Sequence, residues 1–241
     1  MSDATFFKYG KNEVDWLKAR DPELGAAIER IGKIRRKVVP DLFMALINAI
    51  VGQQISTKAQ VTVWGRMLAL VPAMTPEAIA ALSADELQAC GMTFRKALYI
   101  KEIAGAALGG ELDLHALQVL PDDEVCARLS QPNGIGVWTA EMLMIFSMQR
   151  KDILSWGDLA IIRGLRMLHR HRKITPALFA KYKRRYSPHA TVASLYLWAI
   201  AGGACPELVD LAPRAEAKRK SQAKTQGRKE EKRSQPQKPK R

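Results

Sequence analysis

The chain has 241 residues and a formal net charge of +14, which is enough length for a buried core in one or two closely packed domains. Its three cysteines, Cys90, Cys126 and Cys205, lie far apart. This spacing argues against a disulfide framework or a zinc site, and an iron–sulfur cluster would lack its fourth thiolate. No apolar run reaches membrane length and nothing resembles a signal peptide, so we expect a reducing, intracellular compartment and no membrane partner.

The positive charge is concentrated at the end of the chain. Residues 214–241 hold twelve Lys/Arg and three Glu, whereas residues 1–213 hold 26 Lys/Arg against 21 Asp/Glu. The last segment has no large aliphatic or aromatic residue, so it cannot bury enough surface to offset its ordering entropy. We expect a helical domain over 1–213 and a disordered basic tail over 214–241. The tail could serve only to keep the protein soluble, or it could attract the phosphates of a nucleic acid. Because residues 1–213 are also basic, we favour the second interpretation.

Helical spacing of apolar residues dominates the first 213 residues, and strand alternation is scarce. Start signals stand at Ser56-Thr57, at Thr75-Pro76-Glu77 and at Ser83-Ala84-Asp85-Glu86, where a capping side chain or a proline precedes a helical stretch. The predicted helices are a segment through Ile28 and Ile31 after the turn at Asp21-Pro22, then 42–51, 57–71, 76–81, 84–89, 94–108, 121–129, 137–148, 158–170, 175–185 and 188–202. The sequence predicts an all-α fold in which residues 1–35 pack on a later pair of helices.

Two glycines mark a hairpin between the predicted helices 121–129 and 137–148. Gly134 and Gly136 permit a tight turn, and their missing side chains let a phosphate approach the backbone N–H groups at the start of the next helix. The segment indicates a backbone grip on nucleic acid. It could also simply join two helices, or bind DNA without chemistry.

Asp158 is the candidate acid. It follows Gly157 and precedes an apolar stretch, the pattern of a carboxylate that caps a helix. Capping alone would explain the residue. Because Asp158 follows a hairpin that suits DNA binding, we favour the interpretation that Asp158 is a catalytic acid.

Four ordered segments together resemble the helix-hairpin-helix DNA glycosylase superfamily, and most closely its DNA-3-methyladenine glycosylase II branch. The resemblance covers about residues 5 to 205. The matching segments are Ile50-Val51-Gly52-Gln53-Gln54-Ile55-Ser56-Thr57-Lys58-Ala59, Gly134-Ile135-Gly136-Val137-Trp138-Thr139-Ala140, Gly157-Asp158-Leu159-Ala160-Ile161-Ile162-Arg163-Gly164 and Ala193-Ser194-Leu195-Tyr196-Leu197-Trp198. The resemblance implies a two-lobed HhH-GPD glycosylase fold, with the hairpin motif at about 121–148 and the active-site cleft between the lobes.

The resemblance also implies roles for individual residues. Asp158 would be the catalytic acid, and Trp138, Trp198 and Met142 would line the pocket for a flipped base, with Met142 standing where some members have a tyrosine. The residues expected to contact DNA are Gln53, Gln54, Ile55, Ser56, Lys58, Gly134, Gly136 and Thr139. The backbone carbonyls of Ser130, Pro132 and Ile135 would hold a structural Na+, K+ or divalent cation, and no other cofactor is expected.

One position separates two mechanisms within the family. Bifunctional glycosylase/lyases have a lysine after Gly-x-Gly-x that forms a Schiff base with the sugar, and here the residue is Trp138. The resemblance therefore implies a monofunctional glycosylase that uses water to release alkylated purines of the 3-methyladenine type from duplex DNA in base excision repair. Two alternatives stay open: a mismatch or oxidised-base glycosylase, and a non-catalytic helix-hairpin-helix module. We expect a monomer, located in the cytoplasm and on the nucleoid of a bacterium or in the nucleus of a eukaryote.

Overall fold

The computed structural model describes residues 5–213, and within this range the fold is all-α, as predicted. The regular elements are α1 (Lys11–Arg20), α2 (Pro22–Ile31), α3 (Leu42–Gly52), α4 (Thr57–Leu70), α5 (Pro76–Ala81), α6 (Ala84–Ala89), α7 (Phe94–Gly109), a 3-10 helix (Ala116–Val119), α8 (Asp122–Leu129), α9 (Val137–Phe146), α10 (Leu159–Leu168), α11 (Pro176–Tyr186) and α12 (Ala190–Ala201). The extended pairing in the described range is an isolated antiparallel bridge between Phe6 and Lys37. The predicted tail at 214–241 lies outside the described residues.

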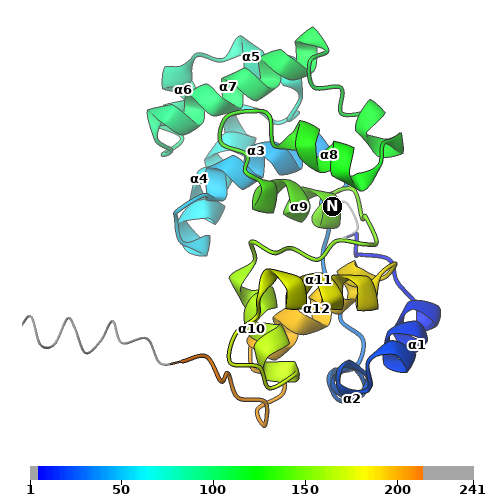
Figure 1. The fold of residues 1–241 in the computed structure, drawn as a ribbon. Helices are drawn as coiled ribbons and strands as arrows, with labels where there is room; N and C mark the ends of the chain where they lie inside the picture. Colours follow the sequence, from blue (N-terminus) through cyan, green and yellow to red (C-terminus); the bar gives the residue numbers. More distant parts are fainter. Residues whose placement is uncertain (1–4, 214–241) are drawn as a thin grey trace, which may run out of the picture.

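The helices form two lobes. One lobe contains α3 to α9, and the other contains α1, α2 and α10 to α12, so the N-terminal helices lie beside the C-terminal ones (Figure 1). Two connections run between the lobes, one from α2 to α3 and the other from α9 to α10. The expected packing of the first residues on a later helix pair is confirmed, since α1 contacts both α11 and α12.

Most helix boundaries follow local chemistry. The side chains of Ser56, Thr75 and Ser83 each accept a backbone N–H bond at the start of α4, α5 and α6. The predicted helix 158–170 ends earlier, at Leu168, and Arg170 has a left-handed φ of 53°. The predicted helix 137–148 likewise ends at Phe146, and Gln149 has a φ of 56°. Left-handed residues at these two places end the helices.

The helix α1 was not predicted from the sequence. It has only one buried residue, Leu17, and most of its other side chains are charged or polar. A helix with such a narrow apolar stripe gives a weak periodic signal. Leu17 is fully buried, and α1 packs against α2, α11 and α12.

A buried ion cluster joins α2 to the C-terminal helices. Asp21 is fully buried, and its Oδ2 accepts bonds from Arg185 Nη1 and Tyr186 Oη, each at 3.0 Å, while Nε2 of His169 lies 3.3 Å away. Burial by itself would raise the pKa of Asp21, but the bonds from His169, Leu24 and Arg185 outweigh it and hold the pKa below its ordinary value. The cluster fixes the end of α10 against α2 and α11.

The two helices α10 and α12 cross in close contact at Gly164. A Cβ at this position would lie 3.0 Å from the carbonyl carbon of Leu197 and closer still to its oxygen. Because the obstacle is backbone, a side chain could be admitted only if one of the helices moved.

No helix of the described chain is long and apolar enough to span a membrane.

We predict that Gly164→Ala destabilises the protein by about 1–3 kcal/mol, the usual range for overpacking. Gly105, in the exposed part of α7, is the matched control because nothing lies within 4 Å of its missing Cβ. Gly105→Ala should leave the stability unchanged or raise it, since alanine favours a helix over glycine. Thermal unfolding of both variants checks this, and equal melting temperatures would show that the helices tolerate separation at Gly164.

Candidate active site

Asp158 lies at the start of α10 with only 7% of its surface exposed. Its Oδ1 accepts the backbone N–H groups of Ala160 at 2.8 Å and Ile161 at 3.0 Å, so the carboxylate caps the helix. The capping role considered from the sequence is therefore confirmed. It occupies only one of the two carboxylate oxygens.

The other oxygen of Asp158 faces Trp138. The indole Nε1–H of Trp138, at the start of α9, donates to Oδ2 over 3.0 Å. A carboxylate offers about four lone-pair positions, and these three bonds leave a position on Oδ2 for a substrate or a water molecule. Trp138 is still 48% exposed, so its ring remains available for contact. The two residues, twenty positions apart in the sequence, meet where the two lobes adjoin.

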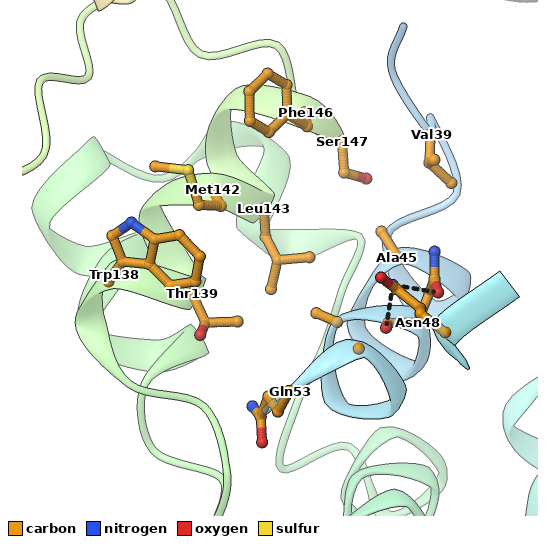
Figure 2. Close-up of a pocket in the computed structure, with 13 residues that line it drawn as sticks. Val39, Ala45, Asn48, Gln53, Trp138, Thr139, Met142, Leu143, Phe146 and Ser147 are labelled. Atoms are coloured by element: carbon orange, nitrogen blue, oxygen red, sulfur yellow. Dashed lines mark hydrogen bonds between the residues drawn. The ribbon is translucent and has the colours of Figure 1, made fainter. Parts of the chain in front are cut away.

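A pocket of about 320 Å³ opens beside Trp138. Figure 2 shows α9 on one side of the pocket and α3 on the other. Val39, in the segment before α3, also lines the pocket. The lining residues are Val39, Ala45, Asn48, Ala49, Gly52, Gln53, Gln60, Trp138, Thr139, Met142, Leu143, Phe146 and Ser147. The pocket belongs to the lobe of α3 to α9, and the other lobe contributes Asp158 through its bond to Trp138.

The structure brings together two of the three residues expected to hold a base. Trp138 and Met142 line the pocket. Trp198 does not line it, and instead lies against Phe146 with ring centroids 5.5 Å apart. Trp198 therefore packs against one residue of the pocket wall. Two residues predicted to contact DNA, Gln53 and Thr139, also line the pocket.

The hairpin requires glycine at one of its two positions. Gly134 has a φ of +88°, and a Cβ there would lie 2.6 Å from Cδ2 of Tyr99. Gln53 Nε2 donates to the carbonyl of Gly134 over 2.6 Å, which ties the end of α3 to the hairpin. At Gly136, nothing lies within 4 Å of the missing Cβ, and no side chain caps the start of α9. The backbone N–H groups there are placed as an anion site requires.

The segment between α3 and α4 projects into solvent. Gln54 is exposed and has a left-handed φ of 55°, an uncommon conformation for a residue other than glycine. Ile55 is 38% exposed and Lys58 is exposed, whereas the hydroxyl of Ser56 is occupied as the cap of α4. Of the five residues predicted here to contact DNA, Gln53 and Ser56 have occupied side chains, and the other three side chains are free. Lys96 anchors the segment by donating to the carbonyls of Val51 and Gln53 at 2.9 and 2.6 Å.

The carbonyls expected to hold a cation have capacity for one. The Pro132 oxygen accepts the N–H of Ile135 at 3.2 Å. Among residues 5–213, no hydrogen bond ends on the carbonyl oxygens of Ser130 and Ile135. Oxygen donors of this kind suit Na+, K+ or a hard divalent cation. Cation binding stays a prediction.

Glu141 was not singled out from the sequence. It stands three residues after Trp138 on α9, and its Oε2 accepts a short bond from the hydroxyl of the fully buried Ser155. Burial raises the pKa of Glu141. The bond from Ser155 and the charge of Lys183 oppose this effect, and the charge of Asp158 adds to it. A lone glutamate in a helix gives no local signal of such a contact, since its partner belongs to the segment before α10.

We predict that Glu141→Gln stabilises the protein at pH 7 and above. A carboxyl with a raised folded-state pKa disfavours the folded state once it ionises, so stability is lost as the pH rises from the unfolded pKa through the folded one. Glutamine can still accept from Ser155 and does not titrate. Its melting temperature should exceed the wild-type value by about 2–4 °C for each kcal/mol gained, and the gap should close below the ordinary pKa of glutamate. Glu111→Gln, at an exposed position, should show no such gap, and a wild-type advantage at pH 7 would contradict the prediction.

Comparison with known proteins agrees with this arrangement. The family described as HhH-GPD superfamily base excision DNA repair protein matches residues 47–189, which include the hairpin and Asp158. DNA-3-methyladenine glycosylase 1 of Schizosaccharomyces pombe is 36% identical over 158 residues, which are 64% of this chain and 69% of the relative. DNA-3-methyladenine glycosylase 2 of Escherichia coli is 29% identical over 199 residues, 76% of this chain and 67% of the relative.

A solved structure covers more of the chain. The DNA-3-methyladenine glycosidase of Bacillus halodurans superposes with a TM-score of 0.77 at 34% identity, over 86% of this chain and 97% of that one. The family match spans more than half of the chain, and the all-helical two-lobed fold agrees with it. The chain belongs to the HhH-GPD superfamily of base excision DNA repair proteins.

Proposed function

We propose that this protein is a monofunctional DNA glycosylase that extrudes alkylated purines of the 3-methyladenine type from duplex DNA and hydrolyses their N-glycosidic bond. The observation that carries the proposal is the bond between Asp158 Oδ2 and the Trp138 indole at the edge of the pocket. It sets a carboxylate beside a cavity whose volume lies within the usual range for small-molecule sites, about 300–1,000 Å³. The related glycosylases of S. pombe and B. halodurans, named for 3-methyladenine, support this substrate class.

The chemistry follows from where charge develops. Breaking an N-glycosidic bond builds oxocarbenium character on the deoxyribose, so a fixed carboxylate stabilises the transition state more than the neutral ground state. Asp158 has the rigidity for this role because three N–H groups orient it. The open position on Oδ2 would face C1′ of the sugar or hold the attacking water molecule.

The pocket suits a cationic base. Purines alkylated at N3 or N7 carry a positive charge and leave readily, so no dedicated general acid is needed. The half-exposed ring of Trp138 offers stacking and cation–π attraction to such a base. Met142, Leu143 and Phe146 make the α9 wall apolar, which favours a flat ring over water.

Exposed groups outside the pocket would hold the DNA. The uncapped start of α9 behind Gly136 can bind a phosphate through backbone N–H groups. The exposed Gln54 and Ile55 would fill the gap left by the extruded nucleotide. A solved structure of the S. pombe 3-methyladenine DNA glycosylase in complex with abasic DNA has a TM-score of 0.67 at 30% identity, over 80% of this chain and 97% of that one, which supports DNA as the partner.

We predict that Asp158→Asn lowers the single-turnover rate of base release by at least about a hundredfold and leaves duplex binding largely intact. Asparagine still caps α10, but it lacks the negative charge that stabilises the sugar cation. The measurement is release of 7-methylguanine from duplex DNA at saturating enzyme. Asp85→Asn, on the exposed face of α6, controls for the change in net charge. A near wild-type rate for Asp158→Asn would place the chemistry at another residue. If the wild type released only mismatched or oxidised bases, the protein would instead be a mismatch or oxidised-base glycosylase.

We also predict that borohydride traps no covalent adduct with DNA and that abasic sites stay uncleaved. Trp138 stands where bifunctional relatives have the Schiff-base lysine, and the amine of Lys96 is held by two carbonyls. Trp138→Lys supplies the missing amine and should become trappable, which makes it the positive control. An adduct with the wild type would assign a lyase activity, with Lys58 as the first residue to test.

A further inference from the structure

Two amide side chains on the α3 side of the pocket fix each other's orientation. Gln60 Nε2 donates to the backbone carbonyl of Asn48 at 3.3 Å and to its Oδ1 at 3.1 Å. A backbone carbonyl can only accept, so the nitrogen of Gln60 must be the atom that faces Asn48. The Asn48 atom that meets this nitrogen must then be Oδ1. Neither amide can rotate by 180° without placing two donors or two acceptors together.

This arrangement leaves one donor and one acceptor for a ligand. Asn48 Nδ2 and Gln60 Oε1 have no hydrogen-bond partner among residues 5–213, and neither belongs to the fully buried unpartnered atoms. Gly52 makes room for the pair, since a Cβ there would lie 2.5 Å from Gln60 Nε2. Figure 2 shows Asn48 across the pocket from the apolar side chains of α9. The pocket therefore has a polar wall of fixed pattern and an apolar wall.

A third polar group in the pocket also lacks a partner. Ser147 is 5% exposed, and its Oγ is buried without a hydrogen bond. Buried polar atoms are nearly always paired, so an unpaired hydroxyl on the pocket lining is a second sign of unused hydrogen-bonding capacity. Both walls of the pocket therefore have polar groups without a partner among the described residues.

We propose that the Asn48–Gln60 pair hydrogen-bonds the Watson–Crick edge of the extruded purine and thereby selects lesions whose edge is intact. This inference rests on the proposed function. Adenine presents the acceptor N1 beside an amino donor, and guanine presents the donor N1–H beside the acceptor O6, so each offers one donor next to one acceptor. Alkylation at N3 or N7 leaves this edge unchanged. A 1,N6-etheno bridge removes the amino donor and occupies N1, so ethenoadenine offers no donor to Gln60 and only the acceptor N6 to Asn48.

The test compares two lesions in the same duplex sequence, 7-methylguanine and 1,N6-ethenoadenine, by single-turnover base release at saturating enzyme. Asn48→Leu removes the donor at similar volume and leaves Gln60 bonded only to the backbone carbonyl at position 48. It should lower release of 7-methylguanine about tenfold. Release of ethenoadenine should fall less, because its edge forms at most one bond with the amide pair. Gln60→Met removes the acceptor from α4 and should act in the same direction, so the inference does not depend on the folding of one variant. Asn12→Leu, at an exposed position of α1, should change neither rate.

The outcomes separate the two proposals. If the wild type releases neither lesion, nor any other alkylated purine, the proposed function fails. If it releases alkylated purines while both variants lower the two rates equally, or change neither, the amide pair does not read the base edge. A larger loss for 7-methylguanine than for ethenoadenine in both variants, with unchanged melting temperatures, supports the inference.

Discussion

The bond between Trp138 and Asp158 is the contact on which the rest of the site depends, because it joins the two lobes at the acid itself. The segment that carries Asp158 is held from behind by α12, where Thr191 Oγ1 accepts the N–H of Ile153 and Ser194 Oγ donates to its carbonyl, both at 3.0 Å. Each of these polar groups is buried and paired. The carboxylate therefore has a defined position before any substrate binds, which electrostatic catalysis requires.

The lobe without the hairpin acts as a rigid support for this one side chain. Its helix α10 is fixed in three places: Asp158 caps its start, Gly164 lets α12 approach its middle, and His169 joins its end to the Asp21 cluster. Shifting α10 along its axis would break contacts at all three. The N-terminal helices thus contribute to the active site from a distance, through the position of α10 and not through contact with a ligand.

The sequence predicted the helices that have a wide buried stripe or, like α5 and α6, a capping side chain at the start, and it predicted the turns that need glycine. Each of these features leaves a local pattern. It did not predict α1, whose core contact is Leu17 alone. At the site, the motifs pointed to Asp158, Trp138 and Met142, which lie at or beside the pocket, and to Trp198, which packs on the pocket residue Phe146. Glu141 and the Asn48–Gln60 pair were missed because each contact joins two segments, with partners 14 and 12 residues apart. Neighbouring residues in the chain give no sign of such pairs.

The surroundings of Asp158 show that the site is incomplete without its partner. Trp138 and Trp156 are 48% and 46% exposed, and Leu159, next to the acid, is 84% exposed. Such exposed apolar surface around a buried carboxylate is typical of a binding surface. When a duplex covers these side chains, water leaves and the effective dielectric constant falls, so the attraction between Asp158 and a sugar cation becomes stronger. The bound DNA would therefore supply the final wall of the site in which its own base is released.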